Sequence, residues 1–208
     1  MTLNEAPGPG FDEVLARRAM CRDFLADEVP AELLKSVLSA AFRGPSAGNT
    51  VGLELLVLES SDVQRYWDVT LPTDRREQFP WPGLLNAPVL VIPVVSPAAY
   101  VSRYGEPDKV ASGLGEGNSA WTVPYWFVDG GAAVMALLLS AESVGLGALL
   151  FGQFRHESAV AETFGIPPEK RALGTIALGF AATGGRAPSA SARRGRPNPG
   201  DLIHRSRW

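Results

Sequence analysis

The stretch from Ala132 to Val144 limits how this chain can fold more than any other feature of the sequence. Ten of its thirteen residues are alanine, leucine, valine or methionine, and Glu142 is its one charged residue. A helix with apolar residues on nearly every side has no face for solvent, so it is expected to be buried. Asp129 is predicted to be its N-cap, because a carboxylate can accept hydrogen bonds from the first free amides. The sequence therefore predicts a central helix packed on all sides.

Gly145 and Gly147 follow this helix and predict its end, since glycine is common just past the last helical turn. Residues 148–151 are predicted to form a short strand, with a turn at Gly152–Gln153. A dinucleotide-binding loop must instead open a helix, so that N-terminal amides meet phosphate. These glycines close a helix, where the free groups are carbonyls, which excludes that interpretation.

Hydrophobic patterns predict the other elements, which are strands at 53–58, 89–95 and 173–180 and helices at 11–18, 30–42 and 157–164. The two kinds of element do not alternate regularly enough for a doubly wound parallel sheet, so the expected class is α+β. Residues 1–10 contain closely spaced prolines and glycines, which predicts a disordered N-terminus. Residues 183–208 contain few core-forming side chains. We therefore predict one domain over 11–182 and a C-terminal arm over 183–208.

Composition excludes several classes of protein. The single cysteine, Cys21, excludes an internal disulfide and suits a reducing cytoplasm. Together with His156 and His204 it does not form a metal-ligand cluster, so no metal is expected. No apolar run approaches the roughly 18 residues needed to span a bilayer. The first residues are neither basic nor apolar, unlike a signal peptide. We therefore expect a cytoplasmic protein without a membrane partner.

Arginine is concentrated in two segments although the formal net charge is −3. One segment holds Arg17, Arg18 and Arg22, and the other, residues 186–208, holds six arginines against the single acid Asp201. An acidic chain with two local basic clusters favours a small anion over a nucleic acid, which would require a broad basic face. For the first cluster, a solvated helix end is an equally acceptable interpretation.

Two further segments are candidates for a binding site. Residues 45–52 are small, polar or glycine, and they expose backbone amides that suit an uncharged ring edge with donors and acceptors. An ordinary helix–strand connection is the alternative. The segment from Tyr104 to Ala120 is rich in glycine and predicts a mobile loop over a site. Trp121 follows it and is expected near a pocket.

Taken together, the segments resemble the flavin-dependent nitroreductase family. The resemblance rests on four stretches, in the family order and spread over nearly the whole chain: Arg18–Phe24, Pro45–Asn49, Gly145–Phe154 and Arg193–Trp208. It implies an intertwined homodimer around a mostly antiparallel sheet flanked by helices. The central helix would contribute to the dimer core, and each C-terminal arm would wrap the other subunit. FMN would lie between the subunits.

The resemblance also implies contacts to the FMN phosphate and ring. Arg18 would bind the phosphate, and Arg22 would bind the pyrimidine side of the ring. Ala19 and Met20 stand where the family often has a second basic residue and then serine. A hydroxyl contact to phosphate is therefore missing, and backbone contacts remain.

In the tail, Arg194 and Arg196 match the family's basic pair that binds phosphate, with Arg193 competing for the same alignment. Guanidinium groups suit this role because they form two oriented hydrogen bonds with a phosphate.

The remaining assignments concern the two sides of the ring. Pro45, Ser46 and Asn49 match a loop that borders the ring from the partner subunit. Gly152 and Gln153 match a turn whose backbone amides point at the flavin N5 and the adjacent carbonyl. After the asparagine the family often has glutamine, proline and tryptophan, where this chain has Val51, Gly52 and Leu53.

The candidates for a substrate pocket are Val51, Leu53 and, from the aromatic segment, Trp121.

By this resemblance the protein is an FMN-dependent oxidoreductase that takes hydride from NADPH or NADH and reduces a nitroaromatic or quinone. The flavin performs the redox chemistry, so no side chain need act as an acid or a base. Two alternatives remain. One is a specialised relative that dehydrogenates a natural product or acts on flavin, which the changes at Val51 and Leu53 favour. The other is a flavin-binding protein without turnover. Nucleic acid is not an expected partner.

Overall fold

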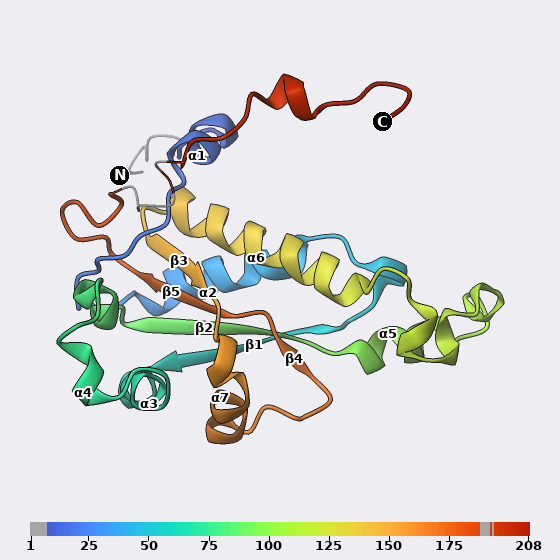
Figure 1. Cartoon of the computed structure of the whole chain (residues 1–208), viewed down its shortest axis with the longest axis horizontal. Coiled ribbons are helices and arrows are strands. Elements are labelled where there is room, and N and C mark those ends of the chain that lie inside the picture. Colours follow the sequence, from blue (N-terminus) through green and yellow to red (C-terminus); the bar gives the residue numbers. More distant parts are fainter. Residues whose placement is uncertain (1–7, 188–191, 193) are drawn as a thin grey trace, which may run out of the picture.

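An antiparallel five-stranded sheet lies at the centre of the computed structural model, which describes residues 8–187, 192 and 194–208 (Figure 1). The strand order is β1-β2-β5-β3, and the short β4 pairs with β2. The strands are β1 Leu53–Glu59, β2 Val89–Val95, β3 Gly147–Phe151, β4 Arg171–Ala172 and β5 Thr175–Gly179. Every residue of β2 is buried, because a strand without polar side chains is stable only with both faces covered.

The α-helices are α1 Phe11–Arg17, α2 Ala31–Ala40, α3 Ser61–Thr70, α4 Thr73–Arg76, α5 Pro97–Tyr104, α6 Tyr125–Ser143 and α7 Glu157–Phe164. Helices α2 and α6 cover one face of the sheet, and α3 and α7 cover the other (Figure 1). Alternate residues of β2 point to opposite faces of the sheet. Val89 and Val91 pack with α6, whereas Leu90 and Ile92 pack with α3. The α+β class predicted from the sequence is therefore confirmed.

Helix α6 begins seven residues before the predicted start at Ala132 and ends within one residue of the predicted end. The prediction that Asp129 caps the helix is wrong, since Asp129 lies inside α6 and Pro124 occupies the N-cap position. The extra turns bury Trp126 against Tyr100 and Trp121. Burial of a large aromatic ring stabilises helical turns that local propensity alone does not specify. Past the other end, Gly145 adopts a φ of 81°, a conformation that glycine adopts readily.

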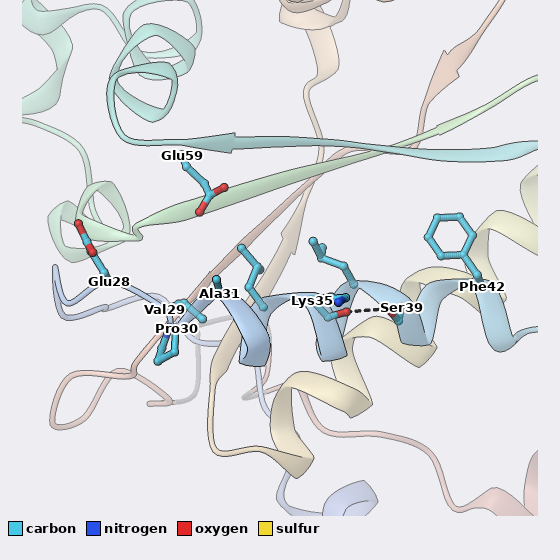
Figure 2. A pocket seen from close by; sticks show the side chains of 10 residues that line it. Glu28, Val29, Pro30, Ala31, Lys35, Ser39, Phe42 and Glu59 are labelled. Carbon is cyan, nitrogen blue, oxygen red and sulfur yellow. Dashed lines mark hydrogen bonds between the residues drawn. The ribbon is translucent and has the colours of Figure 1, made fainter.

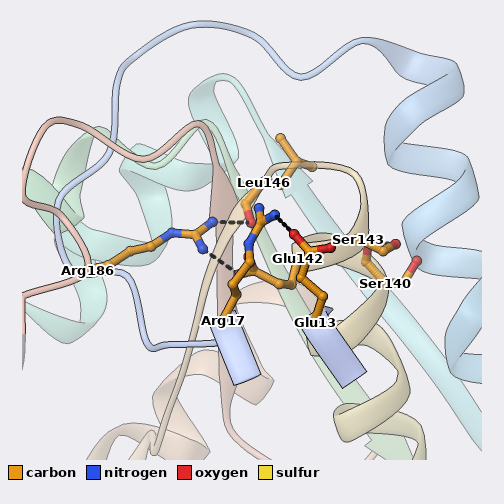
Figure 3. Close-up of polar contacts among 7 residues, drawn as sticks. All are labelled: Glu13, Arg17, Ser140, Glu142, Ser143, Leu146 and Arg186. Atoms are coloured by element: carbon orange, nitrogen blue, oxygen red, sulfur yellow. Dashed lines mark hydrogen bonds and ion pairs between the residues drawn. The ribbon is translucent and has the colours of Figure 1, made fainter. Parts of the chain in front are cut away.

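Glu142 is the charged residue inside the apolar part of α6, and it is 3% exposed. Its carboxylate pairs with Arg186 at 2.5 Å, and Arg17 of α1 lies at 3.4 Å. Arg186 also donates to the carbonyl oxygen of Leu146 at 3.1 Å (Figure 3). This buried acid therefore joins α6 to α1 and to the start of the C-terminal segment.

Residues 105–120 form a compact excursion at the end of α5 (Figure 1). It contains three short 3₁₀ helices, Val110–Ser112, Leu114–Glu116 and Asn118–Ala120, where the sequence predicted an irregular loop. The Trp121 indole donates to the Leu114 carbonyl at 2.9 Å. Arg103 forms two hydrogen bonds of 2.7 Å with the Asp108 carboxylate. The excursion is thus held to the body by polar contacts at both ends.

The C-terminal segment from residue 194 lies on the α1 side of the molecule (Figure 1). Most of the predicted disordered segment, residues 1–7, lies outside the described residues. Residues 194–208 run away from the sheet and contain one 3₁₀ helix, Pro199–Leu202. Leu202, Ile203 and Trp208 are 63%, 62% and 99% exposed in the single chain. No helix within the described parts of the chain is long and apolar enough to cross a membrane.

Candidate functional site

A pocket of about 350 Å³ lies beside the end of β3, and we call it the aromatic pocket. Arg22, Gly152 and Gln153, which the sequence assigned to one side of the flavin, all line it. Six aromatic side chains also line it: Tyr66, Trp67, Phe79, Trp81, Phe151 and Phe154. The pocket is of the size and mainly apolar character typical of small-molecule sites.

Arg22 is half-buried and brings positive charge to the aromatic pocket. Its guanidinium carbon lies 5.8 Å from the centre of the Trp81 ring, a distance that permits a cation–π contact. One Nη atom donates to the Met20 carbonyl oxygen at 3.4 Å. Within the described part of the chain, no ion pair joins Arg22 to Asp23 or Asp27. The guanidinium is therefore not neutralised by these neighbouring carboxylates.

Two residues of the aromatic pocket keep a buried polar atom without a partner among the described residues: Nε1 of Trp67 and Oε1 of Gln153. The other Gln153 atom, Nε2, donates to Thr175 Oγ1 at 3.0 Å. Tyr66 shares a 2.8 Å hydrogen bond with the same hydroxyl, and burial raises the pKa of Tyr66 to about 12. Buried polar groups in native proteins normally have partners. Both atoms are themselves covered by protein, so they mark incomplete hydrogen bonding in the pocket wall.

The turn at residues 152–154 brings an aromatic ring close to backbone. A Cβ at Gly152 would lie 2.7 Å from the tip of the Phe154 ring, so any other residue here would displace that ring. Phe154 itself has a φ of 47° and is 86% exposed. Bulky residues rarely adopt positive φ, and such strain is concentrated at functional sites.

A second pocket of about 280 Å³ contains the other predicted ring contacts, and we call it the loop pocket. Pro45, Ser46 and Asn49 line it together with the predicted substrate residues Val51 and Leu53. The 3₁₀ turn Ala47–Asn49 shapes its wall. The structure brings these five residues to one pocket, whereas Trp121, the third predicted substrate residue, does not line it.

Tyr100 and Asp129 are among the loop-pocket residues that sequence reasoning missed. The Asp129 carboxylate accepts hydrogen bonds of 2.8 Å from the Ala47 amide and from the Tyr100 hydroxyl. The sequence signal that could have found Asp129 was a carboxylate inside an apolar run, but the same pattern also fits a helix cap. Its partner Ala47 lies 82 residues away, so no local sequence pattern reveals the contact.

Several predicted site residues lie outside both pockets. Trp121 is 7% exposed and packs with the aromatic rings of Tyr100 and Trp126. The half-buried segment Arg18–Met20 follows α1, where Met20 bridges to β3. Arg194 and Arg196 are exposed on the tail. The competing Arg193 lies outside the described residues.

The two pockets share no lining residue, so a single chain does not bring the predicted flavin contacts together. A third and larger hollow, of about 690 Å³, runs along α2 beside β1 (Figure 2). It is lined by Lys35, Phe42 and the acids Glu28 and Glu59, and it contains none of the predicted site residues. Among the residues that the structure describes, no group of histidine, cysteine, aspartate or glutamate is arranged to hold a metal.

Comparisons with known proteins agree with this fold and with the sequence resemblance. A protein of Methanothermobacter thermautotrophicus, named as a candidate NADH dehydrogenase/NAD(P)H nitroreductase, is 26% identical over 94% of this chain and 86% of its own length. A candidate nitroreductase of Desulfovibrio desulfuricans, solved in complex with FMN, has a TM-score of 0.69 at 17% identity and covers 97% of this chain and 99% of its own.

An FMN-dependent nitroreductase of Clostridium difficile has a TM-score of 0.65 at 17% identity, with 94% of this chain and 98% of its own covered. At such identities these two structures establish the fold alone. The family model described as "Nitroreductase family" matches residues 15–180, which is most of the chain. This protein therefore belongs to the nitroreductase family.

Proposed function

We propose that the protein is an FMN-dependent oxidoreductase that takes hydride from NADPH or NADH and reduces an electron-poor small molecule, such as a nitroaromatic or a quinone. The observation that carries this proposal is the Arg22 guanidinium in an aromatic-walled pocket, next to the Gly152–Gln153 turn. The names of similar proteins support it, since one is described by NAD(P)H nitroreduction and another was solved with FMN.

The residues of the aromatic pocket fit a flavin ring. Flat aromatic walls suit a planar ring system, and Arg22 adds a cation to the same pocket. When bound, FMN would supply the hydride chemistry that no side chain here can perform. Arg22 would hold the polar edge of the ring and balance its negative charge. The neutral Tyr66 hydroxyl would keep Thr175 and Gln153 in place.

The site is proposed to be completed by a second copy of the chain. The aromatic pocket and the loop pocket each hold half of the expected ring contacts and share no residue, which supports a flavin bound between two subunits. Helix α6 also leaves large apolar side chains exposed in the single chain. Tyr125, Phe127, Val128 and Met135 are between 38% and 50% exposed. An apolar patch of this kind is typical of a protein–protein interface. A homodimer would cover it.

The phosphate of FMN is assigned to Arg18 and to the tail pair Arg194 and Arg196. The tail arginines are exposed, which leaves them accessible to a partner subunit. We propose that the arm from 183 to 208 wraps the other subunit and carries this pair to the phosphate there.

A first prediction concerns the identity of the cofactor. The purified protein is expected to show the visible absorption bands of a bound flavin. On heating it should release FMN and not FAD, since the sequence contains no dinucleotide-binding loop. Addition of NADPH or NADH should bleach the visible bands, and a nitroaromatic or quinone should restore them. Release of FAD, or no flavin binding after reconstitution, would contradict the proposal. Bound FMN that neither nicotinamide reduces would indicate a binding protein without turnover.

A second prediction concerns Arg22. Reduced flavin carries negative charge on its pyrimidine side, so a cation there favours the reduced form. A charge-assisted hydrogen bond contributes about 1.5–3 kcal/mol. Because 30 mV corresponds to about 1.4 kcal/mol for a two-electron couple, Arg22→Ala should lower the FMN potential by roughly 30–65 mV.

Spectroscopic redox titration of fully FMN-loaded proteins measures this shift. Arg22→Lys should recover part of it, because the charge remains and the forked geometry is lost. Arg65→Ala is a matched control, since Arg65 lines neither pocket and contacts Asp62 and the Thr163 carbonyl instead. An unchanged potential in Arg22→Ala would exclude the assigned role.

A specialised relative that dehydrogenates a natural product is a second candidate. The observation that favours it is Val51, which lines the loop pocket with 92% of its side chain exposed. An apolar side chain at this position suits a larger apolar substrate better than a small polar acceptor. Slow steady-state turnover with a nitroaromatic, despite fast reduction of bound FMN by NADPH, would favour this candidate.

A further inference from the structure

We propose that Asp129 is a positioning residue for the flavin site, because its carboxylate holds the loop at residues 46–49 in the conformation that presents Ser46 and Asn49 to the ring. This inference rests on the proposed function, since it takes that loop to border FMN. Asp129 itself need not touch the flavin.

A carboxylate at this point of α6 is unfavourable in free energy unless it is compensated. Asp129 is half-buried in a helix that is otherwise almost entirely apolar through Leu139. Removal of a charge from water is unfavourable unless hydrogen bonds compensate for it. Both compensating bonds reach one atom, Oδ2, from the Ala47 amide and the Tyr100 hydroxyl, each at 2.8 Å. Tyr100 is 2% exposed, so its hydroxyl is fixed in place.

The backbone of the loop at residues 46–49 has an unusual conformation. Gly48 and Asn49 have φ values of 65° and 55°, which place both in the left-handed region. Two successive residues in this region are uncommon, because even glycine and asparagine normally adopt it singly. Such backbone persists only where the surroundings determine it. Ala47, which Asp129 binds, immediately precedes these two residues.

A tether on the other side of the loop completes the arrangement. Arg103 Nε donates to the Gly48 carbonyl oxygen at 2.9 Å, and the Asp108 carboxylate holds the same guanidinium through two bonds of 2.7 Å. A Cβ at Gly48 would lie 2.8 Å from the Tyr104 ring, so only glycine allows this close approach. The loop is thus fixed between α6 on one side and the end of α5 on the other.

These contacts act on the backbone between Ser46 and Asn49, the two residues assigned to the ring. A site residue must be held to within a fraction of an ångström to bind well, and supporting residues provide that precision. Loss of the Ala47 tether would release this turn and let both side chains move. The expected effect is weaker flavin binding rather than loss of the fold.

The test compares Asp129→Ala with Asp129→Asn and with the control Glu157→Ala, which removes a carboxylate that Arg171 binds on α7 outside the loop pocket. Quenching of FMN fluorescence gives the dissociation constant for each protein. Asp129→Ala should weaken FMN binding about tenfold, which corresponds to about 1.4 kcal/mol. Asp129→Asn should bind FMN nearly as tightly as the wild type, because its amide oxygen can still accept the hydrogen bond from the Ala47 amide. Glu157→Ala should bind FMN as the wild type does.

Hydrogen exchange of the Ala47 amide in the flavin-free proteins is a second readout, independent of activity. Exchange should be faster in Asp129→Ala and close to wild type in Asp129→Asn. Arg103→Ala acts on the Gly48 carbonyl from outside the loop pocket and should also weaken FMN binding. If Asp129→Ala does not fold, FMN binding by Arg103→Ala still tests whether the loop must be held in place.

Each outcome has a distinct meaning. If the wild type binds no flavin, the proposed function fails. If the wild type binds FMN and both Asp129→Ala and Arg103→Ala bind it equally tightly, only this inference fails. If Asp129→Asn is as weak as Asp129→Ala, the charge matters instead of the hydrogen bond, and positioning by Asp129 is overturned.

Discussion

A chain that ends at Ala187 is expected to lose tight FMN binding and to behave as a monomer. The deleted residues include Arg194 and Arg196, the proposed phosphate ligands, and the exposed apolar side chains Leu202 and Trp208. Two charge-assisted hydrogen bonds of about 1.5–3 kcal/mol each would be lost. The dissociation constant of FMN should therefore rise at least about 100-fold. The chain should end after Arg186 because Glu142 requires that guanidinium.

Light scattering and FMN titration of the truncated protein measure both effects. The full-length double variant Arg194→Ala/Arg196→Ala is the matched control. It keeps the arm, so it should remain dimeric while it loses most of its FMN affinity. A monomeric full-length protein loaded with flavin would contradict the proposed dimer. Unchanged FMN affinity in the truncated chain would exclude the arm from the phosphate site.

Arg186→Ala should lower the free energy of unfolding by about 3 kcal/mol or more. Glu142 is 3% exposed, and Arg186 is its closest cation at 2.5 Å. Removal of one partner from a buried ion pair leaves an uncompensated charge, which costs about 3–5 kcal/mol. Arg17 remains at 3.4 Å and offsets part of this cost, so the lower end of the range is expected.

Urea denaturation of the flavin-free proteins measures this loss. The double variant Glu142→Leu/Arg186→Ala should recover much of it, because the orphaned charge is then absent. Arg17→Ala is the control from the same cluster. The Arg17 side chain is 49% exposed, and exposed ion pairs contribute at most about 1 kcal/mol. If Arg186→Ala were as stable as Arg17→Ala, the buried pair would not be the main anchor of this segment.

The buried elements could be predicted well from the sequence. Strand β2 was predicted with its observed bounds, and the apolar part of α6 and the glycines after it were also found. These features follow from local physics, because a run without polar residues must be buried and glycine adopts a positive φ readily. The start of α6 was missed because burial of Trp126, a tertiary contact, decides it.

The site could be predicted only in part. The family resemblance of separate segments proposed Arg22, the loop at 45–49 and the turn at 152–153 as flavin contacts. It could not show that these segments fall into two separate pockets, because a pocket is formed by residues distant in the chain.

Two acids in α6 show most clearly what the sequence determined and what the tertiary structure decided. The sequence determined that Glu142 stands in an apolar helix, where a charge is costly, whereas it placed Asp129 at the helix cap. For both acids the tertiary structure decided the partners, among them Ala47, 82 residues before Asp129, and Arg186, 44 residues after Glu142. The physical reason is that apolar burial depends on the local pattern of side chains, whereas compensation of a buried charge depends on whichever donors the fold brings within about 3 Å.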